Sequence, residues 1–166
     1  MSTFAVAKWG KSPQREAIMR FVGDYPAKTD AKGRVFLPAA FRKQLEAAGE
    51  ERLILRPDLF QPCLVLYPEG LWNGLLDALR ARLSRLNGEH QSVLRRFVAE
   101  AEPVELDSNG RFLIGKRKLQ YAHIGSDVRF LAIDDHIEVW DRDTCEAQLS
   151  AGGDLGQALQ ALDLGL

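Results

Sequence analysis

The stretch TDAKGRVFL at residues 29–37 returns in altered form as LDSNGRFLI at residues 106–114. Asp, Gly, Arg and a closing apolar run recur at a constant offset of 77 residues. In each copy, a short amphipathic stretch and a pair of apolar runs follow in the same order. Because an internal repeat determines the architecture, the sequence predicts two copies of one unit: strand, turn, strand, short helix, strand, loop and strand.

Each copy of this Asp-x-x-Gly-Arg motif has the residues that a tight turn requires. The Asp side chain can accept hydrogen bonds from backbone N–H groups two residues on, and the Gly can adopt a positive φ without strain at Cβ. The turn-forming residues are Asp30, Gly33, Asp107 and Gly110. Because extended apolar runs flank each turn, the motif predicts two hairpins, with Arg34 and Arg111 at their rims.

Two roles are open for Arg34 and Arg111, which directly follow the turn glycines. Each arginine could pair with the Asp of its own turn and stabilise it slightly, as exposed ion pairs do. Each could instead contact an anion, because a planar guanidinium suits phosphate groups and guanine edges. The presence of two copies in basic surroundings favours anion contact.

The 166-residue chain is almost neutral, with 22 Lys and Arg against 23 Asp and Glu. Neutrality would argue against nucleic-acid binding if the charges were evenly spread, because phosphate binding depends on Lys and Arg. However, residues 19–43 carry a balance of +4, residues 107–118 carry +3 and residues 134–166 carry −7. One basic segment alone would suggest a solvated face. Two basic segments that each contain the turn motif indicate where DNA would bind.

Other classes of protein fit the sequence poorly. No run approaches the roughly 18 apolar residues that span a bilayer, and no secretory signal is recognisable, so we expect a cytoplasmic protein without membrane contact. Cys63 and Cys145 cannot form a disulfide scaffold. His90, His123 and His136 lie in different predicted elements, and neither cysteine has metal-ligand spacing. We therefore expect no enzyme, no metal site and no cofactor.

Between the two motif copies, apolar residues at helical spacing predict a helical hairpin over residues 71–102. Its first helix carries an apolar stripe made of Trp72, Leu75, Leu76, Leu79, Leu83 and Leu86. Asn87-Gly88 separates it from a second helix that ends before Pro103. We expect both helices to contribute to the core or to a subunit interface. Further helices are expected over about residues 143–149 and 154–164.

These motifs, in this order, resemble the MraZ family of bacterial transcriptional regulators. The matching residues are Phe21-Val22-Gly23, Asp30 to Val35, Leu37-Pro38, Phe41-Arg42, Cys63-Leu64, Leu66-Tyr67-Pro68, Trp72, Glu105-Leu106-Asp107, Gly110-Arg111 and Ile137 to Trp140. The resemblance covers about residues 21–166. It implies an α+β fold made of two tandem AbrB-like swapped-hairpin modules with a helical hairpin between them.

The repeat and the resemblance together predict five segments. These are a flexible N-terminal extension at 1–20, a first AbrB-like module at 21–70, a helical hairpin at 71–102, a second AbrB-like module at 103–145 and a C-terminal helical acidic tail at 146–166. Family members usually begin just before the glycine that corresponds to Gly23. Met19 is therefore a candidate for the natural start of the protein.

The resemblance implies a sequence-specific DNA-binding regulator of its own division and cell-wall gene cluster, associated with the nucleoid. It implies double-stranded DNA and further copies of the chain in a ring-shaped homo-oligomer as partners, with Arg34 and Arg111 as the main DNA contacts and Lys32 as a weaker candidate. Lys116 begins a Lys-Arg-Lys cluster that either extends the basic rim or starts a solvated helix. The alternatives are an AbrB-like antitoxin and a structural oligomer without specific DNA binding.

Overall fold

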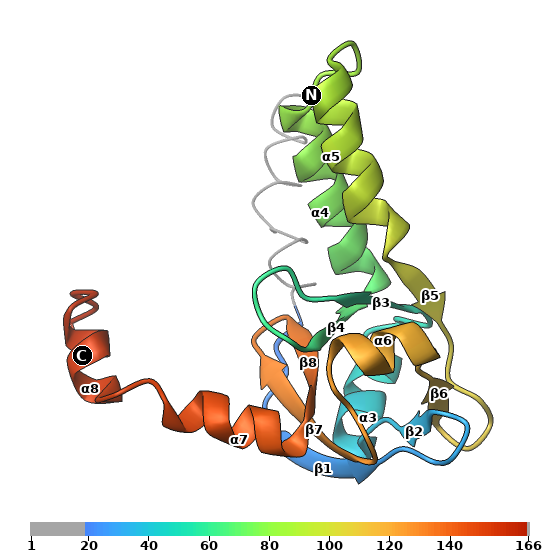
Figure 1. Ribbon diagram of the computed structural model, residues 1–166, viewed down its shortest axis with the longest axis vertical. Coiled ribbons are helices and arrows are strands. Elements are labelled where there is room, and N and C mark those ends of the chain that lie inside the picture. Colours follow the sequence, from blue (N-terminus) through green and yellow to red (C-terminus); the bar gives the residue numbers. More distant parts are fainter. Residues whose placement is uncertain (1–18, 166) are drawn as a thin grey trace, which may run out of the picture.

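The computed structural model describes residues 19–165, and its elements follow the repeat (Figure 1). The first copy contributes β1 (Asp24–Lys28), β2 (Arg34–Phe36), α3 (Ala39–Ala47), β3 (Leu53–Pro57), β4 (Leu64–Pro68) and α4 (Glu69–Arg82). After α5 (Gly88–Ala99), the second copy contributes β5 (Glu102–Val104), β6 (Arg111–Leu113), α6 (Lys116–Tyr121), β7 (Asp127–Ile133), β8 (His136–Asp141) and α7 (Arg142–Ser150), followed by α8 (Leu155–Gln160). Helices and antiparallel strands are combined, which confirms the α+β prediction.

The two copies exchange strands instead of forming separate sheets. Six strands form one sheet in the order β1-β7-β8-β4-β3-β5, and β2 pairs with β6 in a separate two-stranded ribbon. β1 of the first copy lies beside β7 of the second, and β5 of the second copy lies beside β3 of the first. Interchanging the two copies leaves this order unchanged, so the single chain has a pseudo-two-fold arrangement. The swapped-hairpin prediction is confirmed.

The hairpin interpretation drawn from each motif alone is wrong in its strand partners. Inside each turn, the backbone N–H of Gly33 or Gly110 donates a hydrogen bond to the Asp30 or Asp107 carbonyl at 3.0 Å. One further backbone hydrogen bond closes each turn, from Asp30 N to the Arg34 carbonyl at 2.9 Å and from Asp107 N to the Arg111 carbonyl at 2.8 Å. Beyond that bond, the strand before the turn joins the large sheet and the strand after it joins the ribbon. Apolar alternation specifies which face of a strand is buried, whereas the partner strand here comes from the other copy.

The hydrophobic core lies between the six-stranded sheet and a layer formed by the ribbon, α3 and α6. Val35 and Phe112 project into it from the ribbon and Phe41 from α3, each at most 2% exposed. The rings of Phe112 and Phe130 of β7 meet edge to face, with centroids 6.2 Å apart. These buried side chains anchor the inner face of the ribbon in the core. The outer face of the ribbon is therefore exposed to solvent in a fixed position.

The helical hairpin of α4 and α5 projects from the body (Figure 1). At its base, the Trp72 ring stacks on the Phe97 ring with centroids 5.3 Å apart. The guanidinium carbon of buried Arg56 in β3 lies 4.5 Å from the Phe97 ring centroid. The Asn87 side chain caps α5 by accepting hydrogen bonds from two backbone N–H groups. The predicted helical hairpin is therefore present, and aromatic contacts fasten it to the sheet.

Several predicted segment boundaries need adjustment. Met19 packs against the core and Arg20 pairs with Asp134 at 3.2 Å, so these two residues belong to the body and not to an extension. The rest of that predicted extension, residues 1–18, lies outside the described residues. The boundaries predicted after residues 70 and 145 fall inside α4 and α7. Within residues 19–165, no helix has the length and apolarity needed to cross a membrane.

Candidate nucleic-acid interface

The ribbon of β2 and β6 carries two arginines on its outer face. The middle residue of each three-residue strand is buried, and the residues on either side face outward. The register places Arg34 opposite Leu113 and Phe36 opposite Arg111. Phe36 and Leu113 are 53% and 54% exposed. The outer face therefore presents two arginines on one diagonal and two apolar side chains on the other.

In the first turn, Asp30 organises both the backbone and the Arg34 side chain. Its Oδ1 accepts hydrogen bonds from the backbone N–H groups of Lys32 and Arg34, both at 2.9 Å. Its Oδ2 accepts a hydrogen bond from Arg34 Nε at 2.7 Å. These bonds lower the pKa of the Asp30 carboxyl, the backbone N–H of Arg34 having the largest effect.

The second turn repeats this geometry around Asp107. Its Oδ1 accepts hydrogen bonds from the backbone N–H groups of Asn109 and Arg111 at 2.9 Å, and its Oδ2 accepts one from Arg111 Nε at 3.0 Å. The pKa of Asp107 is lowered, mainly by the Arg111 backbone N–H. The Arg111 guanidinium carbon also lies 5.8 Å from the Phe36 ring centroid, a cation–π contact.

The ion pair within each turn and a role in anion contact do not exclude each other. Each Asp holds its arginine through Nε alone. Within residues 19–165, no hydrogen bond engages the Nη groups of Arg34 or Arg111. An arginine oriented in this way keeps its two Nη groups for bidentate contact with an external acceptor. The Arg34 side chain is 37% exposed and that of Arg111 is 23% exposed, so Arg34 is the more accessible.

Gly33 and Gly110 have positive φ values of 88° and 84°. The Gly33 carbonyl accepts a hydrogen bond from Ile114 N at 2.9 Å, and the Gly110 carbonyl accepts one from Leu37 N at 3.0 Å. Each turn is therefore fastened to the strand of the other copy. A Cβ on Gly33 would lie 2.7 Å from the Ile114 carbonyl oxygen, whereas one on Gly110 would lie 3.0 Å from the Arg42 side chain.

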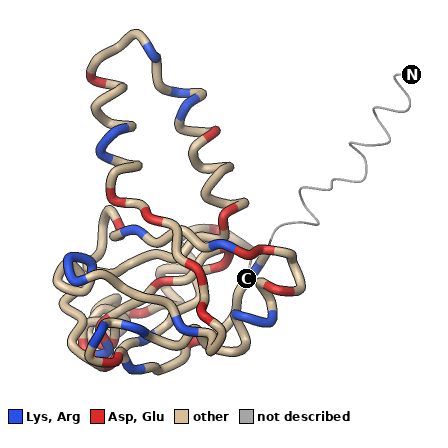
Figure 2. The backbone as a smooth tube through the Cα atoms, turned by 90° about the vertical axis from the view of Figure 1, so that its right-hand side faces the viewer, with Lys and Arg blue, Asp and Glu red and all other residues tan. Residues whose placement is uncertain are grey.

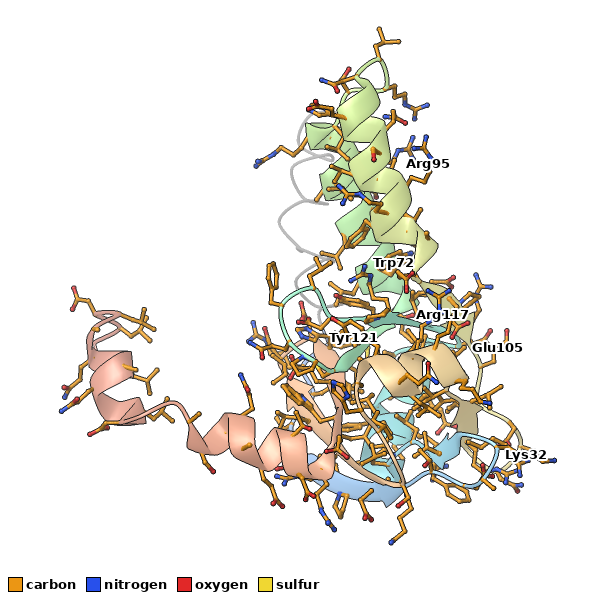
Figure 3. The ribbon with its side chains drawn as sticks, in the orientation of Figure 1. Lys32, Trp72, Arg95, Glu105, Arg117 and Tyr121 are labelled. Atoms are coloured by element: carbon orange, nitrogen blue, oxygen red, sulfur yellow. The ribbon has the colours of Figure 1, made fainter. Side chains whose placement is uncertain are left out.

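The surroundings of the two turns differ in charge. A hollow of about 380 Å³ lies beside the first turn, and its charged lining residues are Lys32, Lys116 and Asp30. A hollow of about 860 Å³ lies beside the second turn, and its charged lining residues are Arg42, Arg52, Glu46, Glu50, Glu51, Glu69, Glu105 and Asp107. Figure 3 shows Lys32 and Glu105 pointing outward on the same side of the molecule. One turn thus has a basic flank and the other an acidic flank.

Strand exchange explains this difference, because each turn lies against a helix of the other copy. Leu119 of α6 lies beside Gly33 of the first turn, and Arg42 of α3 lies beside Gly110 of the second. The basic start of α6 therefore reaches the first turn. The acidic residues at and after the end of α3, Glu46, Glu50 and Glu51, line the hollow beside the second turn instead.

The Lys-Arg-Lys cluster at residues 116–118 was predicted either to extend the basic rim or to start a solvated helix. Its three residues differ in their surroundings. Lys116 lines the hollow beside the first turn. Arg117 Nη2 lies 3.9 Å from Glu100 Oε1, and Lys118 Nζ lies 3.2 Å from Glu102 Oε1. Lys116 therefore adds positive charge at the candidate interface, whereas the other two pair with acidic residues at and just before β5.

Three residues at this face were not predicted from the sequence to belong to it: Phe36, Leu113 and Arg42. The alternation around the buried middle residue of each ribbon strand could have identified Phe36 and Leu113. Arg42 donates a hydrogen bond from Nε to the Leu37 carbonyl at 3.1 Å and covers the second turn. Arg42 reaches the second turn only because the two copies exchange strands. The sequence of one motif does not indicate such an exchange.

Away from the ribbon, Asp58, Cys63 and Glu138 bring their ligand atoms within 4.8 Å of one another, which their sequence spacing did not reveal. Asp58 Oδ2 already accepts hydrogen bonds from two backbone N–H groups of its own loop, at 2.9 and 2.8 Å. Glu138 Oε1 accepts one from Trp140 Nε1 at 2.8 Å. Burial raises the pKa of the Cys63 thiol, so it is protonated at neutral pH. These contacts account for the cluster as part of the packing, and we assign it no ligand.

A family model described as "MraZ protein, putative antitoxin-like" matches residues 21–96 and again residues 97–155. Each matched segment contains one Asp-x-x-Gly-Arg turn. The boundary between the two matches therefore divides the chain as the internal repeat does.

Curated relatives are similar along most of their length. "Transcriptional regulator MraZ" of Phocaeicola vulgatus is 53% identical over 144 residues, which cover 87% of this chain and 94% of the relative. The protein of the same name from Bacteroides thetaiotaomicron is 50% identical over 145 residues, covering 87% and 93%. That of Pectobacterium carotovorum subsp. carotovorum is 31% identical over 152 residues, covering 87% and 99%.

Proposed function

The chain belongs to the MraZ family, and on that basis we propose that it regulates transcription by binding double-stranded DNA through the outer face of the β2–β6 ribbon. The relatives are named as transcriptional regulators and not as members of an enzyme class. One observation supports the proposal most directly. Arg34 and Arg111 are each oriented through Nε by the Asp of their own turn, on one exposed ribbon face.

The ribbon has a form that suits the major groove of B-DNA, which admits a two-stranded β-ribbon. An arginine in this groove can donate two parallel hydrogen bonds to O6 and N7 of guanine. Apolar side chains such as Phe36 and Leu113 can contact thymine methyl groups. The face therefore offers two base-reading arginines and two apolar contacts, which together can select a short sequence.

Lys32 and Lys116 are proposed as phosphate contacts, because both line the hollow beside the first turn. Each neutralised phosphate releases counterions and steepens the dependence of log affinity on log salt by about 0.9. One chain offers few such contacts. We therefore propose a homo-oligomeric ring whose several ribbons bind repeated operator elements together and gain from effective concentration.

The proposed place of action is the nucleoid DNA of the cytoplasm, at the operator of the protein's own division and cell-wall gene cluster. Repeated operator elements would have to match the spacing of the ribbons in the ring, since avidity is lost when geometry prevents simultaneous binding. Protection mapping of the DNA upstream of the gene, combined with native mass spectrometry of the complex, would identify these elements and the number of subunits bound.

The Arg34→Ala variant tests the ribbon as the DNA-binding face. We expect it to lose the specific mobility shift of a duplex taken from upstream of its own gene, because an arginine–guanine pair contributes about 1–3 kcal/mol and the loss recurs in every subunit. The matched control is Arg117→Ala, which removes an arginine that is 90% exposed on α6. This control should bind like the wild type.

Wild-type operator affinity in an Arg34→Ala protein of unchanged oligomeric mass and melting temperature would refute the proposal. An alternative, a structural oligomer without specific DNA binding, predicts a different result. In that case the wild-type protein would show no preference for the upstream duplex over a scrambled one at any salt concentration.

A further inference from the structure

The C-terminal helix α8 leaves its apolar side chains uncovered. It spans six residues and buries none of them. Leu155, Leu162 and Leu164, in and after this helix, are 70%, 64% and 59% exposed. Isolated helices shorter than about 12 residues are marginal in water. Such a helix is stabilised when a surface covers its apolar side.

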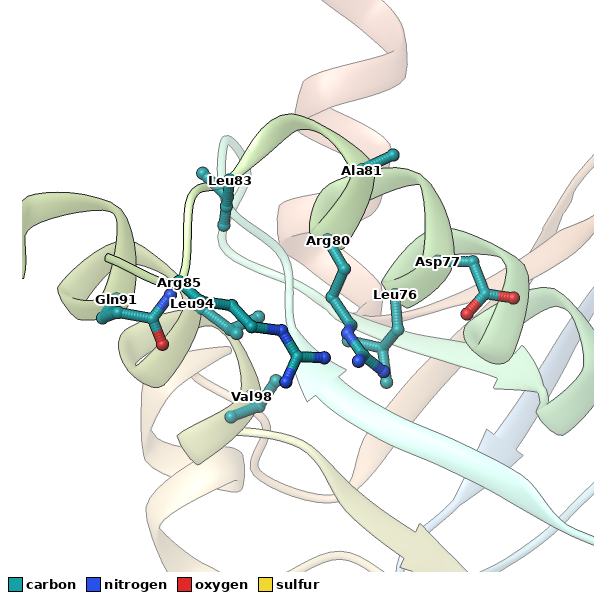
Figure 4. Close-up of a pocket in the computed structure, with 9 residues that line it drawn as sticks. All are labelled: Leu76, Asp77, Arg80, Ala81, Leu83, Arg85, Gln91, Leu94 and Val98. Atoms are coloured by element: carbon teal, nitrogen blue, oxygen red, sulfur yellow. The ribbon is translucent and has the colours of Figure 1, made fainter. Parts of the chain in front are cut away.

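A groove with suitable properties lies between α4 and α5 (Figure 4). Its volume is about 800 Å³ and its apolar lining includes Leu76, Leu83, Leu94 and Val98. The side chains of Arg80 and Arg85 extend over the same opening (Figure 4). Within residues 19–165, no carboxylate forms an ion pair with either arginine. The groove, whose lining also includes Asp77, therefore combines apolar side chains with two arginines that form no ion pair among the described residues.

The part of the hairpin that lies farthest along the chain from the sheet strands, residues 80–96, and the C-terminal segment have opposite charges. Residues 80–96 contain five arginines and one acidic residue, Glu89. Residues 143–166 contain four acidic residues and no Lys, Arg or His. Figure 2 shows the basic residues on both arms of the hairpin, and Figure 3 shows Arg95 pointing away from α5. Opposite charges favour an encounter between the two regions and fix its orientation.

Within one chain, the two regions lie apart. The helical hairpin and the α7–α8 arm project from the body in different directions (Figure 1). α7 is fixed to the sheet, because Cys145 is buried against Trp140 and Glu146 lies 3.5 Å from the Arg129 side chain. This attachment directs α7, and with it α8, away from the helical hairpin of its own chain (Figure 1).

We propose that α8 of one chain docks into the α4–α5 groove of a second copy, with its leucines on the apolar lining and with Asp154 and Asp163 beside Arg80 and Arg85. This docking rests on the homo-oligomer proposed above and names the surfaces that join its subunits. The contact joins different patches of the two copies, and a contact of that type forms a ring when its rotation closes.

The first test removes the apolar contact with Leu155→Asp/Leu162→Asp. We expect the oligomer to dissociate at a concentration about 100-fold higher than in the wild type, measured by native mass spectrometry and light scattering over a dilution series. The matched control is Leu149→Asp, which changes a leucine that is 58% exposed on α7. This control should dissociate like the wild type.

The second test reverses the charges on each side. Arg80→Glu/Arg85→Glu and Asp154→Arg/Asp163→Arg should each weaken the oligomer, and the variant with all four changes should regain most of its stability. Recovery in the fourfold variant would support direct contact between the two regions, because unrelated destabilising changes do not compensate each other.

Two outcomes separate this inference from the proposal on which it rests. A wild-type protein that is monomeric at every concentration would overturn both the homo-oligomer and the docking. An oligomer that resists the leucine changes and both charge reversals would overturn only the docking. Operator binding by Arg34→Ala is measured independently of either result.

Discussion

The first and second turns have the same backbone and different surroundings. In both turns, the Asp carboxylate accepts hydrogen bonds from two backbone N–H groups and from an arginine Nε, with nitrogen–oxygen distances between 2.7 and 3.0 Å. In the second turn, Asn109 stands where the first has Lys32. The hollow beside the first turn is basic and the one beside the second is acidic. Duplication has thus retained the residues that determine the geometry of the turn and changed those that determine its charge.

Because their surroundings differ, the two turns are not expected to contribute equally to a shared interface. Both arginines lie on one ribbon face, so one duplex would meet them together. Phosphates close to the second turn would lie near carboxylates such as Glu46 and Glu105, which repel them within a Debye length of about 8 Å. We therefore expect the first turn to supply most of the affinity and the second turn to act mainly through Arg111.

The largest expected effect is a difference between Arg34→Ala and Arg111→Ala in operator affinity. We expect Arg34→Ala to weaken binding by about 100-fold or more and Arg111→Ala by about tenfold. Arg34 is the more exposed and has a basic flank, whereas Arg111 is engaged with Phe36. Fluorescence anisotropy with a labelled operator measures both. Equal losses would show that the flanking charges do not distinguish the turns.

The next effect concerns stability, and it compares the two glycines. At Gly33 a new Cβ meets a backbone carbonyl, which cannot easily move, whereas at Gly110 it meets the flexible end of Arg42. We expect Gly33→Ala to lower the free energy of unfolding by about 3 kcal/mol and Gly110→Ala by about 1–2 kcal/mol, the ordinary cost of a left-handed residue. Chemical denaturation followed by circular dichroism provides the values. A greater loss for Gly110→Ala would contradict this comparison.

A smaller effect is expected when the second turn is made to resemble the first. Asn109→Lys should raise the affinity for DNA severalfold. It should also steepen the slope of log affinity against log salt concentration by about 0.9 for each new lysine–phosphate contact. The control Asn73→Lys adds the same charge at an exposed position on α4, where it should leave the salt slope unchanged. Titration at several salt concentrations distinguishes the two variants. A steeper slope in both would indicate a response to net charge alone.

The smallest expected difference is in the response of the turns to acid. The pKa of Asp30 and that of Asp107 both lie below the ordinary value of 3.8, for the same reason. Each carboxylate therefore stabilises the fold fully above that ordinary value, and this contribution is lost as the pH falls through the lowered pKa. In the wild type, the free energy of unfolding falls as the pH is lowered below about 4. Asp30→Asn and Asp107→Asn should each make this fall smaller, and by the same amount. Unequal amounts, measured by denaturation over this range, would show that the turns differ in structure as well as in charge.

Local sequence predicted most of the elements, because their signals are local. The alternation around Val35 corresponds to β2 and the break at Asn87 to the start of α5. The stripe that begins at Trp72 corresponds to α4 only as far as Leu79, because α4 ends at Arg82 and the predicted stripe residues Leu83 and Leu86 lie beyond it. The repeat also predicted that the two halves are alike. The strand partners within each motif could not be read locally, since both β1 and β2 pair with strands of the second copy.

The sequence predicted those parts of the candidate site that lie within or directly after one motif. The motif drew attention to Arg34, Arg111 and Lys32, which lie in or beside the turns. The acidic flank of the second turn was not predicted, because residues such as Glu46 come from α3, in the other copy of the repeat. Charges counted along the chain therefore differ from charges gathered in space wherever strands are exchanged.

Strand exchange also determines when the protein can fold during its synthesis. Asp24 at the start of β1 pairs with Leu131 in β7, so one of the first strands to leave the ribosome has to wait for one of the last. The nascent first copy has no ribbon partner and no β7, and its apolar strand edges stay open until the second copy emerges. A topology dominated by such distant pairs folds slowly and late. The same exchange that joins the two turns on one face thus makes each half dependent on translation of the other.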